Sequence, residues 1–179
     1  DQMHALPAEQ IEHIEQEIVQ RLAALYKPDF RTLLFDTTNF FTFIDSTNTR
    51  CTIARRGKNK QKRGDLRQIG LALAVSRHEQ FPLFHKTYEG NKNDVTVFKE
   101  TLGDIIARLK SLSLELSDIT LIFDKGNNSK ANFTLLDAES SPHYVASLIP
   151  SHFKTLMSAA NLGLMPISVD GQELLVYKT

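Results

Sequence analysis

The stretch Leu33-Leu34-Phe35-Asp36-Thr37-Thr38-Asn39-Phe40-Phe41-Thr42-Phe43-Ile44 decides how the rest of the chain is interpreted. It is rich in aromatic and β-branched residues and lacks Gly and Pro, which is typical of a strand in a sheet covered on both faces. Asp36 is the exception, because a carboxylate inside a buried strand loses hydration that a metal ion could replace. A second interpretation is that the strand ends near Asp36 and that Thr37 and Asn39 begin a turn.

A later segment repeats the beginning of that stretch. Leu121-Ile122-Phe123-Asp124 has nearly the same residues as Leu33-Leu34-Phe35-Asp36, and Lys125-Gly126-Asn127-Asn128 follows as a loop. Neighbouring strands in a sheet lie about 4.8 Å apart. If these two strands are neighbours, Asp36 and Asp124 could hold one divalent ion, or two ions about 4 Å apart.

The composition indicates a globular chain, and its net charge of zero does not by itself indicate binding to nucleic acid or to a membrane. Of its 179 residues 41% are hydrophobic, and 21 Lys and Arg balance 21 Asp and Glu. The single cysteine, Cys51, cannot form an internal disulfide, and the six histidines lack the spacing of zinc ligands. No apolar run reaches the length of a membrane span and no secretory leader is recognisable, so we expect a cytoplasmic protein without membrane association.

Hydrophobic periodicity predicts a mixed α/β arrangement. Strands are expected over residues 33–44, 69–75, 81–88, 118–124, 144–148, 165–169 and 173–177. Helices are expected over 8–26, from a cap at Asn93 or Asp94 through Leu109, from a cap at Asn128 or Ser129 through Leu136, and over 151–160. A three-stranded meander followed by right-handed crossovers makes the first and fourth strands parallel and adjacent, which would bring the two aspartates together.

Two further segments have distinct surface patterns. The helix over 8–26 carries an apolar stripe that we expect to pack on the domain's own sheet, with a missing upstream domain or a dimer partner as alternatives: Ile11, Ile14, Ile18, Leu22 and Leu25. Between residues 55 and 67 seven bases accompany one acid, Asp65: Arg55, Arg56, Lys58, Lys60, Lys62, Arg63 and Arg67. A solvated mobile loop and a segment that binds a phosphate backbone both fit this composition.

The element order, with one Asp on the first strand and another at the end of the fourth, resembles the ribonuclease H-like fold of DDE transposases and retroviral integrases. Several segments between residues 31 and 148 look more specifically like transposases of bacterial insertion sequences: Asp36-Thr37-Thr38-Asn39, Lys62-Arg63-Gly64-Asp65-Leu66-Arg67, Gly90-Asn91-Lys92-Asn93-Asp94 and Phe123-Asp124-Lys125-Gly126-Asn127.

This resemblance implies that Asp36 and Asp124 are the first two acids of a catalytic triad that holds two Mg²⁺ ions, with Mn²⁺ as a substitute. It further implies cleavage and strand transfer of double-stranded DNA at element ends and target, by in-line attack of water or of a 3′-hydroxyl. The bases from Arg55 to Arg67 would contact DNA phosphates. Such transposases usually act as homodimers on paired ends, in this case in the bacterial cytoplasm.

The sequence departs from the family pattern at the third acid, a Glu on the helix after the fifth strand. The helix over 151–160 contains no carboxylate, and Glu173, beside a Gly turn in a predicted hairpin, is expected at the surface. The chain begins at Asp1 rather than Met and stops at Thr179, straight after the apolar run Leu174-Leu175-Val176-Tyr177, so we expect a fragment of a longer protein. The third acid would then lie beyond Thr179. Residues 1–28 would be an N-terminal helix, 29–162 an incomplete catalytic core, and 163–179 the start of a β-rich insertion.

Two other functions remain open at this point. One is a nuclease of the same fold that hydrolyses DNA without joining it. The other is a non-catalytic DNA-binding or assembly module, whose binding would fall with salt and would not depend on Mg²⁺. For the transposase interpretation, the missing third acid means that this chain alone is expected to bind metal weakly and not to transpose DNA.

Overall fold

The computed structural model describes residues 6–45, 47–59, 61–138 and 141–177. The chain forms two compact units, Asp1–Ala146 and Ser147–Thr179, which are described separately below. Among the helices of these residues, none is long and apolar enough to cross a membrane. The predicted domain boundaries at 28/29 and 162/163 stay predictions.

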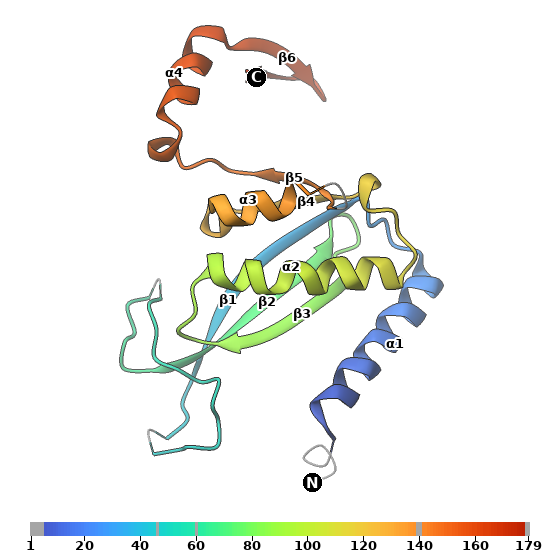
Figure 1. Ribbon diagram of the computed structural model, residues 1–179, viewed down its shortest axis with the longest axis vertical. Helices are drawn as coiled ribbons and strands as arrows, with labels where there is room; N and C mark the ends of the chain where they lie inside the picture. The colour runs from blue at the N-terminus through green and yellow to red at the C-terminus, as the bar shows by residue number, and fades with distance from the viewer. Residues whose placement is uncertain (1–5, 46, 60, 139–140, 178–179) are drawn as a thin grey trace. The chain divides into compact units, whose positions relative to one another are not determined.

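The first unit is built on one five-stranded sheet in the order β3-β2-β1-β4-β5 (Figure 1). The strands β1 (Thr32–Thr42), β2 (Arg67–Ser76) and β3 (Pro82–Glu89) form the antiparallel meander. The strands β4 (Thr120–Phe123) and β5 (His143–Ala146) run parallel to β1. This is the ribonuclease H-like mixed sheet that the sequence predicts, with the first and fourth strands adjacent.

Three helices accompany this sheet: α1 (Ala8–Tyr26), α2 (Asp94–Ser111) and α3 (Lys130–Leu136). Two 3₁₀ turns flank β4, namely η2 (Leu116–Asp118) and η3 (Lys125–Asn127). The second unit contains the 3₁₀ turn η4 (Pro150–His152), the helix α4 (Lys154–Gly163) and a hairpin of β6 (Met165–Val169) with β7 (Gln172–Val176). Every predicted element is present, but β4 is shorter than the predicted strand 118–124, because Asp118 belongs to η2 and Asp124 caps η3.

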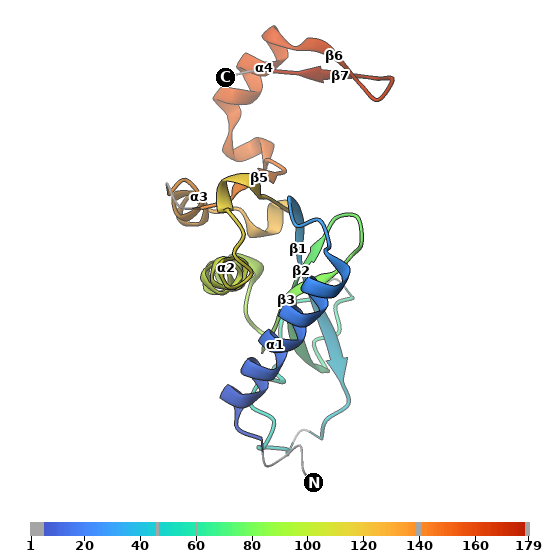
Figure 2. The same ribbon diagram turned by 90° about the vertical axis from the view of Figure 1, so that its right-hand side faces the viewer.

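The core of the first unit lies between α2 and one face of the sheet, and Figure 2 shows α2 along its axis beside that face. Phe98 of α2 is fully buried and contacts two aromatic rings of the sheet. Its ring centroid lies 5.2 Å from that of Phe35 of β1 and 4.6 Å from that of Phe123 of β4. Burying aromatic side chains of this size removes a large apolar area from water. The helix is therefore held against the two strands that lead into the aspartates.

The opposite face of β1 is not covered in the described part of the first unit. Leu34 is 37% exposed, and Asp36 and Thr38 are exposed as well. The expectation of a strand covered on both faces is therefore wrong. Asp36 keeps its contact with solvent, so its position in the strand does not by itself require a metal partner.

The apolar stripe of α1 does not pack on the sheet, and that prediction is wrong. Its five side chains are between 37% and 70% exposed. A neighbouring face of the helix makes the contacts instead: Val19 is buried in the core, and Glu15 Oε1 lies 3.3 Å from Arg108 Nη2 of α2 and 3.3 Å from His85 Nδ1 of β3. Periodicity identified the apolar face of the helix, but the face that contacts the rest of the first unit is the one with Val19 and Glu15.

Gly70 offers a test of the sheet packing. A Cβ on Gly70 would lie 2.1 Å from Tyr88 Cε2 on the neighbouring strand β3, so Gly70→Ala is expected to destabilise the protein by about 1–3 kcal/mol through overpacking. Urea unfolding followed by circular dichroism measures the loss. As a control, Gly103→Ala in α2 meets nothing within 4 Å and should be neutral or stabilising by up to about 1 kcal/mol. Equal stability of the two variants would contradict the packing of Tyr88 over Gly70.

Candidate active site

Asp36 and Asp124 lie at the same edge of adjacent parallel strands. Phe35 of β1 and Phe123 of β4 are partners in register, and each aspartate is the next residue along the chain. Neighbouring strands are about 4.8 Å apart, so the two side chains start from neighbouring positions. Asp36 is inside β1, which runs on to Thr42, and the interpretation that the strand ends near Asp36 is therefore wrong.

Both carboxylates are oriented by short-range hydrogen bonds and are exposed. Asp36 Oδ1 accepts a hydrogen bond of 2.7 Å from the backbone N–H of Thr37. Asp124 Oδ1 accepts one of 2.7 Å from the backbone N–H of Gly126 and one of 3.3 Å from Asn127 Nδ2. These bonds fix one oxygen of each carboxylate and leave the other available to a cation.

Asp94 is a third carboxylate at this edge, and of the two caps predicted for α2, Asn93 and Asp94, the structure selects Asn93. Asn93 caps α2, because its Oδ1 accepts a hydrogen bond of 2.9 Å from the backbone N–H of Thr96. Asp94, the first residue of α2, instead accepts a hydrogen bond of 2.8 Å at Oδ1 from the hydroxyl of Thr37. The residue after Asp36 is thus tied to the start of the helix.

The loop after β4 is held against α2 by a buried asparagine. Asn132 of α3 donates through Nδ2 to the carbonyl of Asn127 at 2.7 Å and to the carbonyl of Val95 at 3.1 Å. Ser129 caps α3 by accepting a hydrogen bond from the backbone N–H of Asn132. This network positions the turn that carries Asp124. The sequence predicts the loop, from its Gly and Asn residues, but not the hydrogen bonds that hold it.

Tyr88 reaches toward the same edge from β3. It is 6% exposed, and its hydroxyl makes no hydrogen bond of good geometry among the described residues. Burial raises the pKa of Tyr88, and the negative charges of Asp94 and Asp36 raise it further, against the opposite influence of the Thr37 hydroxyl. The phenol therefore stays neutral at physiological pH beside the carboxylates. The sequence of β3 predicts a strand but does not indicate that Tyr88 lies near the aspartates.

The donor chemistry at this edge fits a hard divalent cation. Carboxylate oxygens are the protein ligands that Mg²⁺ uses, and Mg²⁺ typically binds one or two of them while keeping several waters. Within the described ranges no group of three or more Asp, Glu, His or Cys side chains is placed so that it could hold one ion together. The arrangement is therefore one of carboxylate pairs rather than of a closed cage.

The segment of seven bases is anchored to the sheet. Arg55 exchanges two backbone hydrogen bonds with Gln68 of β2, and its guanidinium lies 3.8 Å from Glu89. Arg63 donates two hydrogen bonds to Asp65, at 2.8 and 2.6 Å, and Arg67 Nη1 donates to the carbonyl of Asn48 at 2.9 Å. Lys60 lies outside the described residues. Lys58 and Lys62 are exposed.

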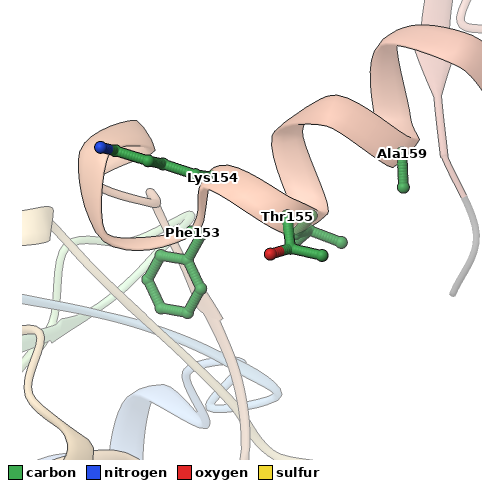
Figure 3. A pocket seen from close by; sticks show the side chains of 5 residues that line it. Phe153, Lys154, Thr155 and Ala159 are labelled. Carbon is green, nitrogen blue, oxygen red and sulfur yellow. The ribbon is translucent and has the colours of Figure 1, made fainter.

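The second unit provides no acid on its helix. A pocket along α4 is lined by Phe153, Lys154, Thr155, Leu156 and Ala159 (Figure 3). Residues 154–163 contain no Asp or Glu. Glu173 is exposed on β7, as expected from its place beside the Gly turn.

No protein-family model matches the sequence, and no curated protein is similar to it. Solved transposase structures are similar to it in fold. The Mos1 transposase paired-end complex with the left transposon end is 12% identical, with 84% of this chain and 45% of that chain covered and a TM-score of 0.43. The piggyBac transposase synaptic complex with hairpin DNA is 12% identical, with 79% and 29% covered and a TM-score of 0.47. The catalytic domain of Mos1 mariner transposase is 11% identical, with 88% and 72% covered and a TM-score of 0.42.

This chain thus spans less than half the length of the first two of these chains. At such identities and TM-scores, the likeness adds nothing beyond the fold that the order and directions of the five strands define.

The Arg63–Asp65 pair predicts a pH dependence. The Arg63 side chain holds the pKa of Asp65 at about 2, below its ordinary value of 3.8, so the pair is intact above that ordinary value and is lost as the pH falls through about 2. Arg63→Gln should return the pKa of Asp65 toward its ordinary value, measured by ¹³C NMR of the carboxyl carbon. Lys62→Gln is the control and should leave the pKa unchanged. The same pKa in both variants would mean that the pair does not form.

Proposed function

We propose that the chain is the catalytic core of an insertion-sequence transposase, which cleaves double-stranded DNA and transfers its strands. The observation that carries the proposal is the register of β1 and β4, since the pairing of Phe35 with Phe123 puts Asp36 and Asp124 side by side. The segments of sequence that resemble bacterial transposases include both aspartates.

In this proposal Asp36 and Asp124 bind divalent metal ions, Mg²⁺ or Mn²⁺, through the oxygens that accept no backbone hydrogen bond. A metal ion bound there would lower the pKa of an attacking water or 3′-hydroxyl and neutralise charge on the leaving oxygen. The backbone N–H groups of Thr37 and Gly126 keep the two carboxylates in fixed orientations. Pre-set ligands of this kind avoid an ordering cost at the moment of reaction.

The segment from Arg55 to Arg67 is proposed to bind DNA phosphates. Its two-point connection to β2 through Gln68 gives the bases a defined starting position. Phosphate contacts fix orientation on a duplex without reading its sequence. A homodimer that acts on paired element ends in the bacterial cytoplasm completes the proposal.

A second candidate is a non-catalytic DNA-binding or assembly module. It is favoured by the carboxylate-free helix α4 and by the lack of a three-ligand group among the described residues. Such a module would bind DNA equally well with and without Mg²⁺, and Asp36→Asn would not change that binding. A nuclease of the same fold would differ from a transposase in lacking end joining by the full-length protein.

Metal binding is the first test of the proposal. A crystal soaked in Mn²⁺ should show an anomalous peak between the carboxylates of Asp36 and Asp124, because both present an oxygen to the same edge. The peak should vanish in Asp36→Asn and Asp124→Asn. It should persist in Asp104→Asn, because the carboxylate of Asp104, in α2, pairs with Lys86 of β3. Absence of a peak in the unaltered protein would contradict metal-dependent catalysis by this chain.

DNA binding is expected to weaken as salt rises, because phosphate contacts release counterions. Replacing Lys58 and Lys62 together by Gln should weaken binding to duplexes of unrelated sequence by the same factor and reduce the slope of log K against log salt by about two. Fluorescence anisotropy at several salt concentrations measures both effects. Lys99→Gln with Lys110→Gln, on the exposed side of α2, is the matched control. An equal loss in both double variants would show that total charge, not this segment, binds the DNA.

A further inference from the structure

Asp94 has one oxygen that its helix and its neighbours do not explain. Its Oδ1 accepts the hydrogen bond from Thr37, and the cap of α2 is supplied by Asn93. Its Oδ2 faces the loop after β4: a Cβ built on Gly126 would lie 3.2 Å from it and 2.9 Å from Asp124 Oδ1. The sum of these two distances is the upper limit of the separation between the two carboxylate oxygens, which belong to different elements.

Gly126 keeps the space beside these two oxygens open. Its backbone φ is not in the left-handed region, so the turn does not need a glycine for its conformation. A side chain at this position would instead fill the space, because its methyl group would press against the carboxylates of Asp94 and Asp124. A glycine at a close approach of this kind commonly marks a place where a ligand or another group comes near the backbone.

Two buried polar atoms of residues near these carboxylates have no hydrogen-bond partner of good geometry among the described residues. The Tyr88 hydroxyl makes no hydrogen bond of good geometry, although the Thr37 hydroxyl is near it, and it lies close enough to Asp94 and Asp36 for both charges to act on it. Asn127 is 1% exposed and donates to Asp124 through Nδ2, while its Oδ1 has no hydrogen-bond partner in the described part of the chain. Buried polar groups are nearly always satisfied, so unpaired ones next to two carboxylates point to an additional ion or its water.

We propose that Asp94 is a third carboxylate ligand at this edge, and that Asp94 and Asp124 bind a divalent cation in the space beside Gly126, directly or through its water. The inference rests on the proposed function and extends it. Because Mg²⁺ takes one or two carboxylates and keeps several waters, the pair suffices without Asp36. Asp124 then contributes to two positions, one shared with Asp36 and one shared with Asp94.

The test is a Mn²⁺ titration of the full chain in which the EPR signal of the free ion measures how much Mn²⁺ is bound. Asp94→Asn keeps an oxygen that can accept the hydrogen bond from Thr37 but removes the negative charge. The variant therefore distinguishes a role of Asp94 in binding metal from a role in holding α2 in place. We expect its Mn²⁺ affinity to fall about 10–100-fold, the range found when groups that support a metal are removed. Gly126→Ala should also weaken Mn²⁺ binding, because its methyl group fills the space although none of the three acids is replaced. Asp104→Asn on the same helix should bind as the unaltered chain does.

The outcomes separate this inference from the proposed function. If Asp94→Asn and Gly126→Ala bind Mn²⁺ as the unaltered chain does, while Asp36→Asn and Asp124→Asn lose it, the role of Asp94 is wrong and the proposed function stands. If Asp94→Asn and Asp124→Asn lose binding and Asp36→Asn does not, the Asp94 position is correct and the proposed pair is wrong. If the unaltered chain binds no Mn²⁺ at millimolar concentration, both are overturned. Melting curves show that each variant is folded.

Discussion

The contact of Phe98 with Phe35 and Phe123 is the constraint on which the site depends. One ring on α2 touches the last buried residue before Asp36 and the last before Asp124, so the same packing fixes the helix and the relative height of the two strands. A shift of β4 by one residue would turn Phe123 away from the core and move Asp124 to the other face, because side chains alternate along a strand. Hydrophobic burial thus determines the register of β1 and β4, and this register brings Asp36 and Asp124 to neighbouring positions.

The same helix also delivers its first residue to that edge. Since Phe98 lies one turn after Asp94, the ring that anchors α2 holds the carboxylate close to Thr37. The other side of the loop is held by Asn132, which bonds to the carbonyls of Val95 and Asn127. The three acids therefore sit on three elements that share one buried contact and one buried hydrogen-bond network. Such support from packed elements is what gives a site a defined geometry.

The fold was accessible from sequence because its signals are local and redundant. The repeated pattern before Asp36 and Asp124, the Gly-containing turns and the periodic helices each predict one element, and chain order with right-handed crossovers leaves few sheets to choose from. The role of Asp94 was not accessible, since capping by Asn93 or by Asp94 differs by one residue and both have suitable side chains. The face of α1 that packs was missed because its contacts, of Val19 with the core and of Glu15 with His85 and Arg108, are made with residues far along the chain and leave no periodic signal.

The unequal lengths of β1 and β4 have a consequence for solubility. β4 pairs with β1 only as far as Phe35, whereas β2 accompanies β1 to Thr42, so from Asp36 onward β1 has an open edge on one side among the described strands. Open edges with exposed aromatic residues such as Phe40 invite pairing with another chain, and proteins commonly discourage it with a charge. Asp36 is exposed where that edge begins, so its negative charge opposes edge-to-edge association, and a neutral residue at this position would remove that protection.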